Sequence, residues 1–309
     1  MFKNAFLVLV IFCGVATNLT ADEKLYFSLQ EVSVTVRSGL NEGSGVIITR
    51  DVLTAPNKTE KINFVWTAGH VIDNLRSVRT IIRDGQSRKV VEFKDALVIK
   101  ELIEDGRKVG EIVMFAKVIK YSDSEEGEDL ALLMIRKKNY VTANASFYAG
   151  KKPISIGTEL YHVGSLLGQV GSNSMTRGIM SSVGRVLNLG SGGGVIFDQT
   201  TVTAFPGSSG GGVFLSERSG DISGQYIGML VRGAGETFNL IVPVRRMRSW
   251  AEKEGVRWAL DMDVKVPSIE EIVSLPVEGA TASKKNDDKK EASNDSKKFP
   301  ILPSSPKGG

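Results

Sequence analysis

Cysteine and histidine are scarce in this chain of 309 residues, which has one cysteine, Cys13, and two histidines, His70 and His162. One cysteine cannot form an internal disulfide, and three scattered residues cannot supply the clustered ligands of a zinc site. We therefore expect no metal. A chain of this length buries roughly three quarters of its unfolded surface, so it can hold a core without either kind of cross-link.

Cofactor-binding motifs are missing as well. Nothing in the sequence matches a phosphate-binding P-loop. The glycine-rich stretch Gly190–Gly194 lacks the third glycine of a dinucleotide fingerprint, and no helical pattern follows it. We interpret this stretch as a flexible surface loop and expect no cofactor.

A strong charge of one sign is also lacking, since 39 Lys and Arg face 35 Asp and Glu for a formal net charge of +4. Residues 279–309 supply +3 and Lys3 supplies +1, so residues 22–278 are neutral. The composition of residues 279–309, rich in Lys, Ser, Asn, Asp and Pro, predicts a disordered tail. Such a tail could touch anionic cell wall, lipid or DNA, but a solvated tether is the favoured interpretation. We expect no nucleic-acid partner.

No long hydrophobic run is present. The apolar stretch near the N-terminus extends only from about residue 5 to residue 16, whereas a bilayer crossing needs roughly 20 residues. Lys3 precedes this stretch, and small or polar residues lie between it and Asp22, which is the pattern of a cleaved signal peptide over residues 1–21. The alternative is a membrane anchor. We expect a secreted or periplasmic protein without a stable membrane anchor after cleavage.

Short runs of β-branched and aromatic residues dominate the middle of the chain, at intervals of about ten residues. They include residues 32–36, 45–49, 63–67, 130–135, 195–203 and 226–231. This pattern predicts an all-β barrel or sandwich rather than alternating βαβ units. Residues 104–107 have the composition of a hairpin turn. One helical pattern occurs at about residues 244–260, where Met247, Trp250, Ala251, Val256 and Trp258 could form an apolar face.

The β-rich region is too long for one small barrel, so we expect it to form two. We expect a first β-barrel over residues 22–145 and a second β-barrel with the helix over residues 146–260, joined near residues 140–155. An extension over residues 261–278 then leads to the tail.

Three segments carry groups that a serine hydrolase needs: a hydroxyl beside an imidazole, a carboxylate that orients the imidazole, and N–H donors for an oxyanion. Ser209 lies in the glycine-rich segment Pro206–Gly212, which could equally be a plain loop. His70 ends an apolar run that we interpret as a strand, where a histidine is more often a core or edge residue. Asp129 directly precedes the apolar run of residues 130–135, although it could be one more exposed charge of an acidic loop.

The order of these residues selects among hydrolase classes. Gly207, Ser209 and Gly211 also fit the nucleophile elbow of α/β-hydrolases, whose histidine follows the serine, but both histidines precede Ser209. The order acid, histidine, serine would need a parallel α/β pattern that the sequence lacks. The remaining order is histidine, acid, serine on an all-β chain.

Several motifs then resemble those of trypsin-like serine proteases, in the cysteine-free bacterial branch that includes the HtrA/Deg proteases and the glutamyl endopeptidases. Residues 66–70 (WTAGH) resemble T-A-A-H, residues 129–132 (DLAL) resemble D-x-A-L, and residues 206–211 (PGSSGG) resemble P-G-N-S-G-G. Residues 43–48, 161–168 and 238–244 are similar to further strands of that branch. The resemblance implies two six-stranded antiparallel β-barrels with the active site in the cleft between them.

The resemblance also implies roles for individual residues. Ser209 would be the nucleophile, His70 the general base and Asp129 the residue that orients it, with the N–H groups of Gly207 and Ser209 forming the oxyanion hole. Departures from the pattern are Gly69 for alanine, Ser208 for asparagine, Leu166 for proline and Gly212 for proline. The residues after Trp250 are too few for the PDZ domain of HtrA proteases, so regulation through such a domain is not expected.

Substrate specificity can be inferred only from the residues that would line the substrate pocket. Thr203, six residues before Ser209, would lie at the base of the substrate pocket, and Met229, Leu230, Val231 and Arg232 would form one wall. Without a carboxylate at the base, Lys or Arg at P1 is disfavoured, apolar P1 residues are plausible, and Arg232 leaves an acidic P1 open. The second histidine, His162, is interpreted as structural. Protein or peptide substrates are expected, while the rivals are a catalytically silent protease fold that binds peptides or envelope components and a binder acting through its tail.

Overall fold

The computed structural model describes residues 20–278, except 84–85, 105–106, 126, 189–193 and 234–236. The expected signal peptide, apart from its last two residues, and the expected tail lie outside the described residues. The same is true of the interpreted loop at residues 190–193 and of the two central residues of the turn expected at 104–107, although the flanking strands do pair at Glu104 and Arg107.

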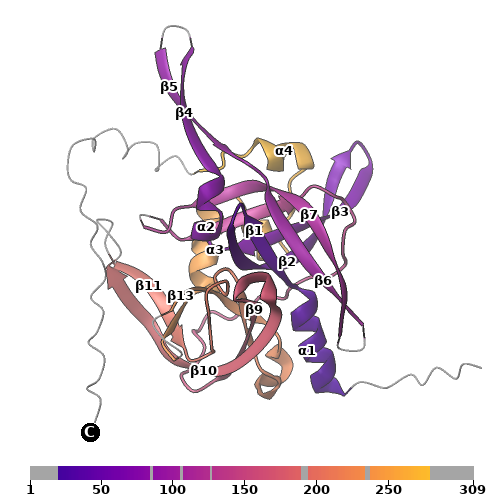
Figure 1. The fold of residues 1–309 in the computed structure, drawn as a ribbon, viewed down its shortest axis with the longest axis vertical. Coiled ribbons are helices and arrows are strands. Elements are labelled where there is room, and N and C mark those ends of the chain that lie inside the picture. The colour runs from indigo at the N-terminus through magenta and orange to yellow at the C-terminus, as the bar shows by residue number, and fades with distance from the viewer. Residues whose placement is uncertain are drawn as a thin grey trace, which may run out of the picture.

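Two closed six-stranded barrels make up the body of the protein (Figure 1), which confirms the predicted all-β fold class. The first barrel has the order β1-β2-β3-β8-β7-β6 and the second has the order β10-β11-β14-β13-β12-β9, with antiparallel pairing throughout. The strands are β1 (Ser33–Ser38), β2 (Asn41–Ala55), β3 (Lys58–Thr67), β6 (Ala96–Glu104), β7 (Arg107–Ser122), β8 (Leu130–Ile135), β9 (Glu159–Leu166), β10 (Gly171–Asn188), β11 (Gly194–Thr200), β12 (Gly212–Leu215), β13 (Tyr226–Gly233) and β14 (Asn239–Pro243).

The C-terminal helix covers one wall of the first barrel. Trp66 of β3 contacts Trp250 of α3 (Val244–Lys253), and Phe64 contacts Trp258 of the 3₁₀ turn η4 (Arg257–Ala259). Alternate residues of β3 face the barrel interior, and α3 and η4 cover the opposite face. The strand is therefore buried on both faces from Ile62 onward. That double burial explains why the run before His70 is apolar without alternation.

The predicted helix over residues 244–260 was wrong in its length, because α3 ends at Lys253. Gly255 adopts a left-handed backbone conformation with φ of +71°. The N–H of Val256 donates to the carbonyl of Ala251, which is the pattern of a glycine-terminated helix end. Val256 and Trp258 are nevertheless buried, so the apolar residues were identified correctly while their secondary structure was not.

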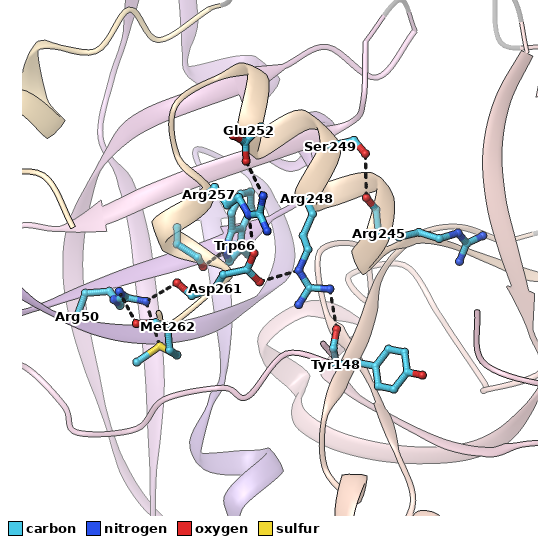
Figure 2. Close-up of polar contacts among 11 residues, drawn as sticks. Arg50, Trp66, Tyr148, Arg245, Arg248, Ser249, Glu252, Arg257, Asp261 and Met262 are labelled. Atoms are coloured by element: carbon cyan, nitrogen blue, oxygen red, sulfur yellow. Dashed lines mark hydrogen bonds and ion pairs between the residues drawn. The ribbon is translucent and has the colours of Figure 1, made fainter. Parts of the chain in front are cut away.

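The chain after η4 returns to the first barrel and is fastened there by polar contacts (Figure 2). Arg50 of β2 donates to the carbonyls of Asp261, Met262 and Val264 at 3.1, 3.2 and 2.8 Å, while the indole of Trp66 donates to the carbonyl of Ala259 at 2.9 Å. The short helix α4 (Ile269–Ser274) follows. Farther along, the carbonyl of Val277 accepts from the N–H of Tyr121 at 2.9 Å. We call residues 261–278 the C-terminal strap.

Other elements were not anticipated from the sequence. Helix α1 (Ala21–Glu31) opens the described chain with a capping box between Thr20 and Glu23. The hairpin of β4 (Arg76–Arg83) and β5 (Gln86–Phe93) projects from the body as a separate two-stranded sheet (Figure 1). The remaining short elements are α2 (Gly69–Ile72), η1 (Asp73–Leu75), η2 (Gly168–Val170) and η3 (Glu217–Ile222). None of the helices among the described residues is long and apolar enough to span a membrane.

Candidate active site

The histidine and the acid are brought together by two neighbouring strands of the first barrel. Strands β3 and β8 are antiparallel with Thr67 opposite Ala131, so the end of β3 and the start of β8 lie at the same edge of the sheet. His70 follows the end of β3 and Asp129 directly precedes β8. The expectation that His70 ends a strand was wrong, because β3 stops at Thr67 and His70 lies in the short helix α2.

Asp129 holds His70 through both the backbone and the side chain. The carboxylate is buried, with a residue exposure of 2%, and both of its oxygens lie 3.0 Å from His70 Nδ1. One of these oxygens also accepts the backbone N–H of His70 at 3.0 Å. Because a carboxylate can only accept, Nδ1 carries the proton of a neutral imidazole and Nε2 is left with its lone pair. The pair therefore presents a base at Nε2.

The end of β7, directly before the acidic loop of residues 123–125 and 127–128, packs tightly against residues 68–72, which we call the histidine turn. A Cβ added to Gly69 would lie 2.3 Å from the carbonyl oxygen of Ser122, closer than any real contact. This close approach explains why glycine replaces the alanine of the family motif at position 69. The loop is also tied to the second barrel, since Arg246 forms an ion pair with Glu128 and Arg232 donates to the carbonyl of Ser124 at 2.7 Å.

The serine loop, Phe205–Gly211, closes in a turn with the features of type II. Pro206 and Gly207 occupy its central positions, Gly207 has φ of +94°, and the N–H of Ser208 donates to the carbonyl of Phe205 at 2.9 Å. A Cβ on Gly207 would lie 2.3 Å from the carbonyl oxygen of Ser165, so both conformation and space require glycine there. The departure Ser208 also fits, because its buried hydroxyl accepts the N–H of Phe205 at 3.1 Å.

Every carbonyl from Phe205 to Ser209 has a hydrogen-bond donor. Besides the carbonyl of Phe205, that of Pro206 accepts from Leu167 N–H at 2.7 Å and that of Ser208 accepts from Gly211 N–H at 3.0 Å. The carbonyls of Gly207 and Ser209 both accept from Ser44, at 2.7 Å each. Among the described residues, nothing accepts from the N–H groups of Gly207 and Ser209. Two backbone donors of the loop are thus left for an acceptor from elsewhere.

The serine loop packs directly against the turn that carries His70. A Cβ on Gly210 would lie 2.5 Å from Thr67 Oγ1 and 3.0 Å from the N of Ala68. A Cβ on Gly43 would touch both Val71, next to His70, and the carbonyl of Ser209. Within the described part of the chain no hydrogen bond joins Ser209 Oγ to His70. Such catalytic hydrogen bonds often form only when substrate is bound.

Most of the residues predicted to form the substrate pocket lie on strand β13, which pairs with the serine loop. The backbone of Leu230 pairs with Gly210 and Gly211 at 2.8 and 3.0 Å, which joins strand β13 to the loop. The side chains of Met229, Leu230 and Val231 are buried in the barrel cores, so strand β13 would contribute mainly backbone to a pocket. Thr203 is half-buried, and its carbonyl accepts from Thr176 Oγ1 at 2.8 Å. Arg232 points its guanidinium at the acidic loop, as described above.

The second histidine, His162, is fully buried in β9, with Nδ1 3.0 Å from the carbonyl of Gly212. Burial lowers its pKa to about 4. In the unfolded chain an imidazole titrates near its ordinary pKa of about 6.5, so the unfolded state binds the additional proton between these two values. The free energy of unfolding should therefore fall as the pH drops through this window, by about 2.5 kcal/mol between pH 7.5 and 4.5.

Urea unfolding at both pH values measures this effect. A His162→Gln protein keeps a donor for the carbonyl of Gly212 but cannot titrate. Because all other titrating groups are shared, its loss of stability between the two pH values should be smaller than that of the wild type by the same amount. Equal losses in the two proteins would contradict the prediction.

Sequence reasoning missed three residues that shape the serine loop: Ser44, Leu167 and Ser208. Leu167 has φ of +59°, unusual for a residue with a side chain, and this conformation accompanies the hydrogen bond from its N–H to the carbonyl of Pro206. The departures at positions 166 and 208 from the family pattern were the available signals. Nothing in the sequence alone pairs Ser44 with a loop more than 160 residues away.

Comparisons with known proteins agree with this arrangement. The profile of the trypsin-like peptidase domain family matches residues 43–224, more than half of the chain. The chain is 28% identical over 189 residues to a Do-like serine protease HtrA of Lactobacillus helveticus, covering 61% of this chain and 35% of that protein. It thus spans about a third of that relative's length.

Solved structures share the fold. A serine endoprotease from Yersinia pestis superposes with a TM-score of 0.51 at 16% identity, covering 77% of this chain and 68% of that chain. An HtrA-type protease solved with a tripeptide gives a TM-score of 0.52 at 18% identity, covering 77% and 64%. The match of the family profile, which includes the segments of His70, Asp129 and Ser209, makes this chain a member of the trypsin-like peptidase family.

Proposed function

We propose that this protein is a secreted serine endopeptidase that hydrolyses peptide bonds through Ser209, His70 and Asp129 and an acyl-enzyme intermediate. The single observation that carries the proposal is the hydrogen bonding of the serine loop, in which the carbonyls from Phe205 to Ser209 are all bound while the N–H groups of Gly207 and Ser209 have no acceptor among the described residues. A loop that only linked two strands would not need two unpaired donors beside a buried His–Asp pair.

The proposed mechanism assigns one step to each group of the site. Ser209 Oγ attacks the peptide carbonyl while His70 Nε2 takes its proton, and His70 later returns that proton to the leaving amine. The buried Asp129 carboxylate keeps the proton of the imidazole on Nδ1 and stabilises the imidazolium that forms. The N–H groups of Gly207 and Ser209 donate to the oxyanion of the tetrahedral intermediate.

Polypeptide substrates agree with the family to which the chain belongs, and export agrees with the signal-peptide pattern of residues 1–21. The pocket residues Thr203 and Met229–Arg232 support apolar rather than basic P1 residues. An acidic P1 now has less support, because the guanidinium of Arg232 already donates to Ser124.

The rival function is a silent protease fold that binds peptides without cleaving them. Labelling by a fluorophosphonate probe separates the two, because only an activated serine reacts with it. We expect the wild type to be labelled and the Ser209→Ala protein not to be. Ser216→Ala, which alters a buried serine that directly follows β12 and caps η3, is the matched control and should be labelled like the wild type. An unlabelled wild type would favour the silent fold.

A further inference from the structure

Ser44 joins the first barrel to the serine loop of the second. It lies in β2, is fully buried, and uses all of its polar groups. Its N–H donates to the carbonyl of Ser209 at 2.7 Å and its hydroxyl donates to the carbonyl of Gly207 at 2.7 Å. The same hydroxyl accepts the N–H of Ser165 at 2.7 Å, and the carbonyl of Ser44 accepts from Thr67 Oγ1 at 2.7 Å.

Ser44 binds only two carbonyls of the serine loop, those of Gly207 and Ser209. The two residues whose carbonyls Ser44 binds, Gly207 and Ser209, are the same two whose N–H groups have no acceptor among the described residues. A carbonyl fixed on one side of a residue limits how far that residue's backbone can rotate. Glycine has more backbone rotational freedom than any other residue type, so a fixed carbonyl restricts the backbone most at Gly207.

The hydroxyl of Ser44 has only one orientation that satisfies both of its partners. It carries a single proton, which goes to Gly207, while a lone pair receives the N–H of Ser165. Ser165 is itself held from the first barrel, since its hydroxyl lies 2.5 Å from Thr35 Oγ1, and Thr35 is opposite Ser44 across strands β1 and β2. The three hydroxyls are all buried, so water does not compete for these bonds.

We propose that Ser44 is a positioning residue that, by fixing the carbonyls of Gly207 and Ser209, holds the backbone of these two residues in the conformation in which their N–H groups bind the oxyanion. This inference rests on the proposed endopeptidase function. The first barrel would then supply the histidine and the acid and would also position the oxyanion donors of the second barrel. Ser44 touches neither the substrate nor a reacting atom, so its effect is exerted through Gly207 and Ser209.

The prediction concerns the transition state rather than substrate binding. In a Ser44→Ala protein the carbonyl of Gly207 loses its donor, so the peptide between Gly207 and Ser208 is freed. The preceding peptide, which carries the N–H of Gly207, is then held only on its far side, by Leu167 at the carbonyl of Pro206. We expect kcat to fall by about 10- to 100-fold, with KM changed little, because the oxyanion exists only during the reaction. A peptide boronate, which forms a tetrahedral adduct with the serine, should bind more weakly by about the same factor as kcat/KM falls.

The matched control is Ser33→Ala. Ser33 is a buried serine of the neighbouring strand β1 whose hydroxyl donates to a backbone carbonyl, that of Leu29, at 2.8 Å. Ser33→Ala loses one buried hydrogen bond, whereas Ser44→Ala loses two, so Ser44→Ala should also be the less stable protein, and both are assayed at a temperature at which both are folded. Only Ser44→Ala should lose kcat and boronate affinity. Ser44→Cys keeps the shape of the side chain but places a larger sulfur, which is only a weak donor, at the hydroxyl position, so it should resemble Ser44→Ala in kcat.

Two results would overturn the inference: a Ser44→Ala protein with the kcat of Ser33→Ala, or one that loses kcat while boronate affinity stays unchanged. Failure of the proposed function would look different. In that case the wild type itself would neither cleave peptides nor react with the fluorophosphonate, before any change at Ser44.

Discussion

A His70→Ala protein should cleave its best peptide substrate about 10⁵- to 10⁶-fold more slowly than the wild type. The reason is that Ser209 Oγ then has no base, since the other histidine, His162, is fully buried and its lowered pKa reflects an apolar surrounding. The measurement is kcat for a fluorogenic peptide chosen from a library. The residual rate reports the oxyanion donors, which the substitution leaves in place.

The combination of variants provides the control. Members of a catalytic unit are not additive, so His70→Ala combined with Ser209→Ala should be no slower than Ser209→Ala alone. A His70→Ala protein that kept a tenth of the wild-type rate would refute the assignment of the base. If the wild type and both variants shared one background rate, the silent binding protein would be the better description.

An Asp129→Asn protein should fold normally and yet lose about 10⁴-fold in kcat. Asp129 has φ of +56°, a conformation that asparagine tolerates better than almost any other residue with a side chain. The backbone N–H of His70 can still be accepted by the amide oxygen. The amide nitrogen then faces Nδ1 as a donor, so the imidazole moves its proton to Nε2 and can no longer act as a base.

The comparison with Asp123→Asn separates catalysis from general charge effects. Asp123 lies in the same acidic loop, and its side chain accepts the N–H of Glu125 at 2.7 Å, a role that asparagine can also fill. We expect near wild-type kcat from this control and equal melting temperatures for the two proteins. If both variants lost the same amount of activity, Asp129 would have no special role in orienting His70.

The barrel strands were predictable because the sequence of each strand is by itself typical of β structure. The run of residues 130–135 coincides with β8, and the pattern of residues 226–231 falls within β13, since β-branched residues between turn signals depend little on the rest of the chain. The histidine turn was not predictable in detail. Residues 64–67 are buried on both faces, with α3 and η4 packed on Trp66 and Phe64, so periodicity could not show where β3 ends and α2 begins.

The candidate site also has a part that the sequence predicts and a part that it does not. The three triad candidates could be named from motif order, because each motif is a short contiguous stretch. What holds them could not be named, because it depends on contacts between distant segments. Ser44 binds Gly207, Arg246 binds Glu128, and Leu167 binds Pro206, and each pair is brought together only by the packing of elements that lie far apart in sequence or on different barrels.

The C-terminal strap has a consequence for the order in which this protein can fold during synthesis. The first barrel leaves the ribosome with Trp66 and Arg50 still uncovered, because their partners Ala259 and Asp261 are made about 200 residues later. Contacts of such sequence separation form slowly and late. Since N-terminal units generally begin to fold first, the first barrel should wait in an incomplete state until α3 and η4 have been made. These two elements and the strap would then complete the wall formed by β2 and β3, the strand that leads to His70, so competent chemistry is delayed until they have left the ribosome.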